Sequence, residues 1–392
     1  MQPPGPAVQR LQQLLGLCVQ QEASDLHLVP DSAPYLRVHG ILAPVPGQAA
    51  LSQAEISALV EALLGDVERD ALLHSGALDG AMTATDGTRF RFNVFRRQGS
   101  LAIALRRLEE RFHSLAELGL PDMLYQLCTL ADGLVLVAGP TGAGKSTTLA
   151  TLLDRINQTR RCHIVTIEDP IEYLHRPALS LVNQRQVGSD TRSFHEALVA
   201  AMRQDPDVIL VGEIRDLATM RTAIIAAETG HLVLTTVHAG DCVGAIERLT
   251  SVFPADEQDG IRRQLSLVLR AVVTQHLLLA DGSAGRGSAP AAAAAGTAAP
   301  LRRRVVASEV LMVTPAVAHL IATARSAQIY SAMETGGGLG MQTLEDNLAH
   351  LVLQGHIAES TAMAMARNPA VMRDRLALLQ KRRGPVSGGG RR

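Results

Sequence analysis

Hydrophobic residues in the first hundred positions follow helical or alternating spacings. The helical spacing predicts an amphipathic helix over residues 8–18, and Ser52 followed by Glu55 marks the start of a second helix. Alternating polar and apolar residues predict four β-strands, at 25–28, 35–39, 80–85 and 89–95. Together these elements predict a small α+β domain with an antiparallel sheet over residues 1–107.

After a charged and then helical linker at 108–118, the pattern changes to uninterrupted apolar runs. These runs alternate with helical segments and lie at 134–137, 162–167, 208–211 and 231–236. Strands that are apolar on both faces are typical of a parallel sheet covered by helices on both sides. The pattern therefore predicts an α/β domain of the RecA-like nucleotide-binding kind over residues 119–380, mostly helical after about residue 255.

Two stretches depart from this pattern in composition. Residues 281–300 are rich in Ala, Gly and Ser, which predicts a flexible surface insertion, and a basic strand-like run follows at 302–306. The Gly- and Arg-rich residues 381–392 predict a disordered tail, an interpretation that we favour over nucleic-acid binding.

A glycine-rich stretch, GPTGAGKSTT, joins the apolar run at 134–137 to the helical segment that follows it. The order of strand, glycine loop and helix is that of a P-loop, whose backbone N–H groups and helix N-terminus surround phosphate oxygens. Lys145 would neutralise the β and γ phosphates of ATP, and the Ser146 hydroxyl would bind Mg²⁺. The alternative is a chance glycine turn before a helix. The predicted ATP-binding residues are Gly139, Pro140, Thr141, Gly142, Ala143, Gly144, Lys145, Ser146 and Thr147.

Hydrolysis also requires a carboxylate that can activate water near the γ phosphate. Glu213 follows the apolar run at 208–211 and should therefore lie at the carboxyl edge of the sheet, where parallel α/β folds bind ligands. This position makes Glu213 the candidate general base or water-positioning residue. The alternative is a surface carboxylate that caps the next helix.

A second acidic cluster ends the run at 162–167. Glu168, Asp169 and Glu172 would repel one another beside bound phosphate unless a cation lay among them, which suggests Mg²⁺ held partly through water. We assign Asp169, with Ser146, as the metal-binding pair. The alternative is a solvated acidic turn.

Two histidines, His231 and His238, bracket the last apolar run. A histidine at a strand end is more often structural than catalytic. Because this strand should end near the γ phosphate, we favour a role for both in sensing the state of the nucleotide, without assigning them as metal ligands.

Composition limits the partners and the compartment. The formal net charge is −1 and aromatic residues make up 3% of the chain, which speaks against nucleic-acid binding. The cysteines form no C-x-x-C pair, so neither a disulfide framework nor a zinc site is expected. We expect neither a membrane span nor a signal peptide, and hence a cytoplasmic protein.

Taken together, these motifs resemble the secretion ATPase superfamily of type II secretion and type IV pili, and most closely its PilT-type retraction motors. The resemblance extends from about residue 23 to 356. The motifs that carry it include ASDLHL at 23–28, RFRFNVF at 89–95, GPTGAGKSTTLA at 139–150, TIEDPIEYLH at 166–175, QDPDVILVGEIRDLATM at 204–220 and AAETGHLVLTTVHAGD at 226–241.

The resemblance implies a homo-hexameric ATPase that powers pilus retraction from the inner membrane, where it meets a platform protein and possibly a sister ATPase. It makes Glu213 the catalytic glutamate, places Glu168, Asp169 and Glu172 in the family's acidic box, and places His231 and His238 in its histidine box. It also implies that the N-terminal domain is PAS-like and brings arginines to a neighbouring subunit's nucleotide. The candidates are Arg91, Arg97 and, foremost, Arg106, with solvated strand faces as the alternative.

Two departures from the family bear on function. Retraction motors carry AIRNLIRE where this chain has AVAHLIAT at 316–323, so the apolar face remains while both arginines and the glutamate are absent. The insertion at 281–300 is also atypical. The alternatives are therefore an accessory or regulatory ATPase of a pilus or type II secretion system, which its own ATPase activity would test, or a RecA-like translocase, which DNA-stimulated turnover would reveal.

Overall fold

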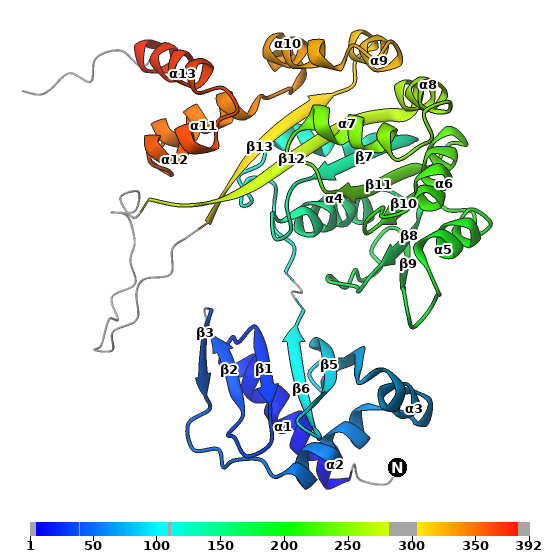
Figure 1. The fold of residues 1–392 in the computed structure, drawn as a ribbon, viewed down its shortest axis with the longest axis vertical. Helices are drawn as coiled ribbons and strands as arrows, with labels where there is room; N and C mark the ends of the chain where they lie inside the picture. The colour runs from blue at the N-terminus through cyan, green and yellow to red at the C-terminus, as the bar shows by residue number, and fades with distance from the viewer. Residues whose placement is uncertain (1–4, 39, 109–110, 282–303, 383–392) are drawn as a thin grey trace, which may run out of the picture. The chain divides into compact units, whose positions relative to one another are not determined.

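The computed structural model describes residues 5–38, 40–108, 111–281 and 304–382. Its described residues divide into two compact units (Figure 1). The first comprises residues up to Arg111 together with Glu172–Leu174, and the second comprises Phe112–Ile171 and the residues from His175 onward. Arg111 lies inside the predicted linker, and the predicted domain boundaries themselves stay predictions.

The first unit is built on a six-stranded antiparallel sheet with the order β3-β2-β1-β6-β5-β4. Four of these strands were predicted, whereas β3, β6 and the helix α3 were not. The elements are α1 (Pro6–Gln20), β1 (Asp25–Leu28), β2 (Tyr35–Val38), β3 (Ile41–Pro44), α2 (Gln53–Leu63), α3 (Asp66–Ser75), β4 (Ala77–Thr83), β5 (Arg89–Arg97) and β6 (Ser100–Arg107).

Alternation along the strands separates the two faces of this sheet. Leu26, Phe90 and Ile103 are at most 1% exposed and pack with α1 and α2 in one core. The intervening residues of the same strands, among them Asp25 and Arg106, lie on the opposite face, where they are register partners. The predicted capping box is present, because Ser52 and Glu55 exchange hydrogen bonds at the start of α2.

The second unit contains a seven-stranded sheet with the order β13-β12-β7-β11-β10-β8-β9. The strands from β12 to β9 are parallel, and β13 runs antiparallel to β12. Their bounds are β7 (Gly133–Ala138), β8 (His163–Glu168), β9 (Leu181–Gln186), β10 (Val208–Val211), β11 (Leu232–Val237), β12 (Leu269–Leu279) and β13 (Arg304–Met312). Every residue of β7, β10 and β11 is buried, as the uninterrupted apolar runs predict.

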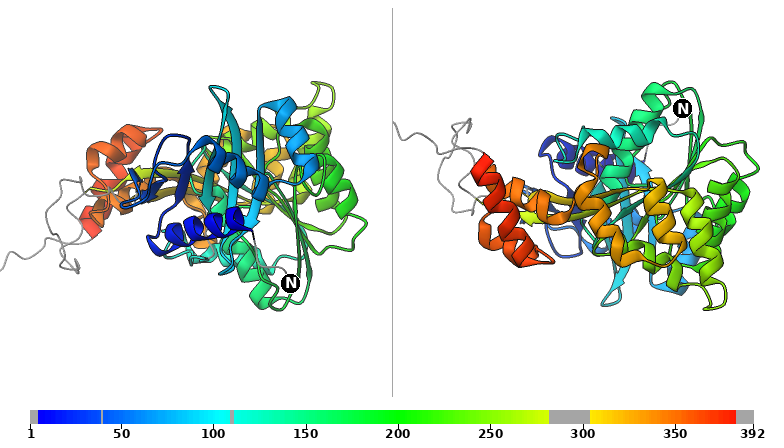
Figure 2. Two further views of the ribbon diagram at one scale, coloured as in Figure 1. Left: turned by 90° about the horizontal axis from the view of Figure 1, so that it is seen from below. Right: turned by 90° about the horizontal axis from the view of Figure 1, so that it is seen from above.

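Helices cover both faces of this sheet. One core joins it to α5–α10, and a second core, on the other face, joins it to α4 and the 3-10 helix η1. Figures 1 and 2 show α9–α13, coloured from orange to red, following one another after β13. The bounds are η1 (Asp122–Thr129), α4 (Lys145–Thr159), α5 (Phe194–Ala201), α6 (Leu217–Glu228), α7 (Cys242–Ser251), α8 (Gln258–Val268), α9 (Pro315–Ala322), α10 (Ile329–Thr335), α11 (Leu344–Leu353), α12 (Glu359–Met365) and α13 (Pro369–Arg382).

The described region after residue 255 is mostly helical, as predicted, and its strands are β12 and β13. Strand β12 was not predicted, whereas β13 overlaps the predicted basic strand-like run at 302–306. Two other expectations from the sequence need correction. The expected helical end of the linker is a hydrogen-bonded turn at 115–119. Residues 381 and 382 belong to α13 rather than to a disordered tail. Residues 282–300 of the insertion and 383–392 of the tail lie outside the described residues.

A buried histidine makes the stability of the second unit depend on pH. His175 is 6% exposed, and its ring stacks on Phe112 with the centroids 4.7 Å apart. Among the described residues its Nδ1 has no hydrogen-bond partner. Burial lowers the pKa of His175 from 6.5 to about 4, because the charged imidazolium is poorly solvated there. The folded chain therefore holds this ring neutral at a pH where the unfolded chain protonates it.

We expect the free energy of unfolding to fall by about 3 kcal/mol as the pH drops from about 6.5 to about 4. His175→Phe should remove this part of the pH dependence, since phenylalanine does not titrate. Urea unfolding followed by circular dichroism across this pH range measures the effect. The control is His74→Phe on α3, where the side chain is exposed. A slope that is unchanged in His175→Phe would show that this histidine is not responsible.

Candidate functional site

The predicted phosphate loop connects β7 to α4 at the carboxyl edge of the parallel sheet (Figure 1). The strand ends at Ala138 and the helix begins at Lys145, which confirms the predicted order of strand, loop and helix. Gly139, Gly142 and Gly144 have φ angles of 147°, 77° and 89°. Side chains disfavour these values, so the loop needs glycine to direct its N–H groups inward.

Gly139 also packs closely against β12. A Cβ atom at this position would lie 2.4 Å from the backbone oxygen of Gln275, whereas a Cβ at Gly142 would meet nothing within 4 Å. The Gln275 side chain is buried and hydrogen-bonded to the hydroxyl of Thr148 in the first turn of α4. Strand β12 therefore supports both the start of the loop and the start of the helix.

This packing predicts unequal effects for two alanine substitutions. Gly142→Ala should lower the free energy of unfolding by about 1 kcal/mol, because only the backbone conformation is strained. Gly139→Ala should lower it by about 3 kcal/mol, because β12 must also shift. Urea unfolding without nucleotide compares the two variants, and equal losses would contradict the close packing against Gln275.

Lys145 lies over the phosphate loop, with its ammonium directed back at the loop. The Nζ atom donates hydrogen bonds of 3.0 Å to the carbonyl oxygens of Gly139 and Pro140. Because Lys145 is also the first residue of α4, its charge adds to the positive end of the helix dipole. An anion that enters the loop would meet both.

Glu213 lies at the same edge, two residues after β10, which is the second strand from β7 and its loop. Its strand β10 is separated from β7 by β11, which corresponds to roughly 10 Å at ordinary strand spacing. Gly212 is held on both sides, because its N–H donates to Ile167 and its carbonyl oxygen accepts from the Thr236 hydroxyl at 2.7 Å. The expected position of Glu213 at the carboxyl edge is confirmed, and its side chain is 19% exposed.

Two cationic or titratable groups face the Glu213 carboxylate. Arg215 forms an ion pair with Glu213 and reaches Asp169 at 3.8 Å. The Nε2 atom of His238 lies 3.6 Å from Oε2 of Glu213. Sequence reasoning missed Arg215, although its place two residues after Glu213 in the conspicuous run GEIRD offered a signal.

The acidic residues at and after the end of β8 have different partners. Glu168 accepts hydrogen bonds from the Thr166 hydroxyl at 2.6 Å and from Gln184 at 3.2 Å, while Asp169 faces Arg215. Glu172 groups with the first unit. Within the described ranges, no three His, Cys, Asp or Glu side chains gather where they could hold a metal ion. The expectation that a cation held partly through water lies among these carboxylates stays a prediction.

The two histidines lie at opposite ends of β11. His238 follows the carboxyl end of β11, as expected. Its ring faces Glu213. His231 precedes the amino end, where its carbonyl oxygen accepts from Gly133 and its Nδ1 lies 2.8 Å from the carbonyl oxygen of Ala226. A parallel strand brings only one of its ends to the phosphate edge, so His231 lies at the opposite edge of the sheet. A role for His231 in sensing the nucleotide stays a prediction.

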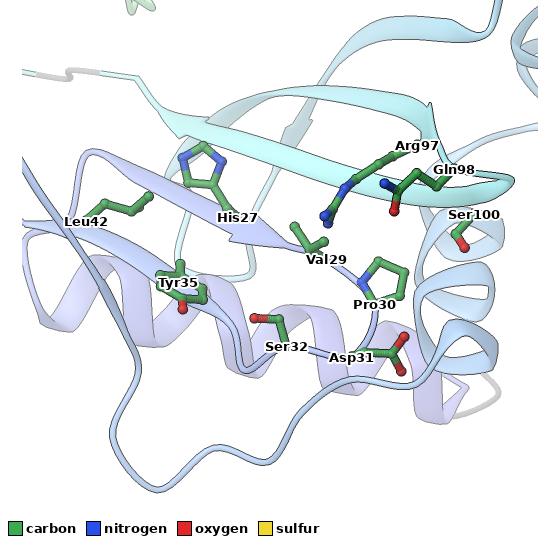
Figure 3. A pocket seen from close by; sticks show the side chains of 10 residues that line it. All are labelled: His27, Val29, Pro30, Asp31, Ser32, Tyr35, Leu42, Arg97, Gln98 and Ser100. Atoms are coloured by element: carbon green, nitrogen blue, oxygen red, sulfur yellow. The ribbon is translucent and has the colours of Figure 1, made fainter.

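The candidate arginines lie on the first unit. Arg106 on β6 donates a 2.8 Å hydrogen bond to Asp25 and is 65% exposed, with Arg91 opposite it on β5. Hydrogen bonds from Ser24 and Arg106 lower the pKa of Asp25 although burial opposes them. Arg97 lines a cavity of about 750 Å³ with His27 and Tyr35 (Figure 3). Whether any of these arginines serves a neighbouring subunit stays a prediction.

The segment that departs from the retraction motors forms the helix α9. Val317 and Ile321 are fully buried in the core beneath the helices, so the apolar face is retained. His319 is exposed, and it stands at the position of the asparagine in AIRNLIRE, next to the first of the two missing arginines. The departure thus concerns the outer face of α9 and leaves the fold intact.

Comparisons with known proteins agree with this arrangement. The family model "Type II/IV secretion system protein" matches residues 3–363. The chain is 40% identical to the type IV pilus retraction ATPase PilT of Pseudomonas aeruginosa, over 91% of this chain and 98% of that protein. It is 39% identical to a twitching motility protein of Neisseria gonorrhoeae, over 86% of each.

A solved structure is similar over the same length. The crystal structure of the pilus retraction motor PilT with bound ADP superposes with a TM-score of 0.83 at 38% identity, covering 93% of this chain and 99% of that one. No helix among the described residues is long and apolar enough to cross a membrane. By its motifs, fold and relatives, the chain belongs to the type II/IV secretion system protein family, whose members include pilus ATPases.

Proposed function

We propose that this protein is a motor ATPase that hydrolyses ATP to power type IV pilus retraction. The observation that carries the proposal is the edge of the second unit's sheet, where Glu213 and the phosphate loop flank β11 and its His238. Similarity to PilT over nearly the full length of both chains supports retraction as the output.

In the proposed reaction the loop holds the triphosphate and Glu213 directs the water. The loop N–H groups and Lys145 bind the β and γ phosphates, so the Lys145 ammonium exchanges its two carbonyl partners for phosphate oxygens. Glu213 accepts a proton from a water molecule as its oxygen attacks the γ phosphorus, and ADP leaves with the electrons of the broken P–O bond. Arg215 must release Glu213 for this step.

A magnesium ion fits this donor set. Ser146 at the start of α4 and the exposed Asp169 offer the hard oxygen ligands that Mg²⁺ prefers. The remaining ligands would come from phosphate and water, since no group of three His, Cys, Asp or Glu side chains gathers in the described chain. When bound, the ion neutralises charge on the phosphates.

We further propose that the chain works as a homo-hexamer. In this arrangement the N-terminal unit, which we assign as PAS-like, packs on a neighbouring subunit and brings Arg106 to that subunit's nucleotide. Hydrolysis then moves one subunit against the next. The motion would be passed to a platform protein of the inner membrane, which places the motor at the cytoplasmic face of that membrane.

A deletion strain tests the retraction proposal. Loss of a retraction motor should leave surplus surface pili and abolish twitching, and wild-type protein, but not its Lys145→Ala variant, should restore both. Loss of surface pili would instead indicate an assembly motor and would overturn the proposal. An unchanged strain would also overturn it.

An accessory role is the second candidate. The outer face of α9 supports it, because residues 316–323 lack the two arginines and the glutamate of the retraction motors that the chain resembles. If the protein is an accessory ATPase, its deletion should change twitching only in a strain that also has a sister retraction ATPase, and only when that ATPase works against a mechanical load. Comparing single and double deletion strains distinguishes the two roles.

A further inference from the structure

The loop that carries His238 is held from several directions. We call residues 238–241, between β11 and α7, the His238 loop; Cys242 directly follows it as the first residue of α7. The Nε2 atom of His276 on β12 lies 2.9 Å from the carbonyl oxygen of Gly240. Glu309 on β13 accepts a 2.8 Å hydrogen bond from the backbone N–H of Cys242. These contacts attach the loop and the start of α7 to β12 and β13.

A further contact attaches the same loop to the C-terminal helices. Arg367, between α12 and α13, places its Nη2 atom 3.0 Å from Oδ2 of Asp241 and its Nη1 atom 3.3 Å from Oε1 of Glu309. Asp241 also caps α7, because its other carboxylate oxygen accepts from the backbone N–H of Gly244 at 2.6 Å. One guanidinium therefore spans the loop and the strand behind it.

The other side of Arg367 is fixed to the helices α10 and α11. The backbone N–H groups of Arg367 and Asn368 donate to Oε1 of Glu345, at 3.0 and 3.1 Å, and Glu345 is fully buried on α11. The Tyr330 hydroxyl of α10 donates to the second oxygen of Glu345, and the Arg367 guanidinium lies 5.6 Å from the Tyr330 ring. The arginine is thus held at both its backbone and its side chain.

The Arg367 guanidinium separates two carboxylates, those of Glu309 and Asp241. Glu309 is 2% exposed, and burial raises its pKa although the Cys242 N–H and Arg367 oppose the rise. Asp241 adds a second carboxylate nearby. Without the guanidinium, two carboxylates would face each other in a largely dry environment, which is unfavourable unless one is protonated or moves. Movement of Asp241 would displace the loop, because only two residues separate it from His238.

We propose that Arg367 is a positioning residue that holds His238 beside Glu213 and couples the state of the nucleotide to the C-terminal helices α11–α13. Nucleotide-dependent movement of the His238 loop is passed through Asp241 and Arg367 to Glu345 on α11. The inference rests on the proposed function only in taking the sheet edge with the phosphate loop as the nucleotide site. It assigns the helices α11–α13 as the part of the chain that responds to the nucleotide.

Hydrogen exchange with and without ADP tests the coupling in the full-length protein. In the wild type, ADP should slow amide exchange in the P-loop, in the His238 loop and in α11. In Asp241→Asn the response of α11 should be at least about tenfold smaller, while that of the P-loop remains. Asparagine caps helices as well as aspartate does, so this variant loses the ion pair without losing the cap of α7. Arg367→Ala should behave in the same way, and Arg367→Lys should retain part of the response.

Arg375→Ala is the matched control. Arg375 on α13 pairs with Glu334 and Asp346 and therefore anchors the same helices without contacting the His238 loop. The control should keep the response of α11 to ADP. An undiminished response in Arg367→Ala and Asp241→Asn would overturn the proposal, as would an equal loss in Arg375→Ala or the absence of any response of α11 in the wild type.

A kinetic measurement separates positioning from simple destabilisation. Arg367→Ala should lower kcat for ATP hydrolysis by about tenfold while the Kd for ADP stays within about twofold, because the phosphate loop is untouched. A change in Kd alone would contradict a positioning role. If the wild type hydrolyses no ATP, the proposed function fails, but the exchange response to ADP still tests the coupling on its own.

Discussion

Replacing Glu213 with glutamine is expected to reduce kcat for ATP hydrolysis by about 10²–10⁴-fold, the range of general base catalysis. Glutamine has nearly the same size but cannot accept the proton of the attacking water. The affinity for ATP should change by less than about threefold, because Glu213 follows β10, about two strand spacings from the phosphate loop. The variant should therefore bind ATP and leave it uncleaved.

Steady-state turnover at saturating ATP and Mg²⁺ measures this effect. The matched control is Glu228→Gln, the same chemical change at the end of α6, which leads to the amino end of β11. It should keep wild-type turnover. A Glu213→Gln protein that hydrolyses ATP at the wild-type rate would remove this residue from the mechanism.

Replacing Lys145 with alanine is expected to weaken ATP binding by about 100-fold or more. Charge-assisted hydrogen bonds to phosphate contribute about 1.5–3 kcal/mol each, and the ammonium can make more than one. Arg215 at the same edge is already paired with Glu213 and Asp169. It offers no ready replacement for the lost charge.

The chain provides an unusual control for this variant. The sequence contains two lysines, Lys145 and Lys381, so Lys381→Ala makes the same change far along the chain, near the end of α13. Equilibrium binding of a fluorescent ATP analogue should show the loss in Lys145→Ala and wild-type affinity in Lys381→Ala. Equal affinities for both variants would mean that the loop does not hold the phosphates.

The sequence predicts well those parts of the site that are formed by consecutive residues. The phosphate loop requires glycine at positive φ and a helix directly after it, and both constraints appear in the run from Gly139 to Lys145. Glu213 was found for the same reason, since a fully buried strand of four residues directs the next polar side chain to a predictable edge.

Predictions failed where the answer depends on distant residues. The run that becomes β12 is apolar with few interruptions, and such runs suit a buried helix as well as a buried strand. Its identity is decided by pairing with β7 and β13. In β6 the alternating positions include two alanines, Ala102 and Ala104, which weaken the contrast that marks a strand.

The two predicted histidines lie apart for a topological reason. Two residues that flank a strand are close in sequence but lie at opposite edges of the sheet, separated by the length of the strand, about 20 Å for the six residues of β11. Arg367 was missed for the opposite reason. It lies 126 residues after Asp241 in the chain, and only the folded C-terminal helices bring the two together.

The central claim is that Glu213 drives the cleavage of ATP held by the loop around Lys145. Mixing radiolabelled ATP with an excess of purified protein, followed by acid quenching, measures this single cleavage event. The account predicts that the wild type converts bound ATP to ADP and phosphate while Glu213→Gln retains it as ATP. Cleavage by Glu213→Gln at the wild-type rate, or a wild type that binds ATP and never cleaves it, would contradict the account.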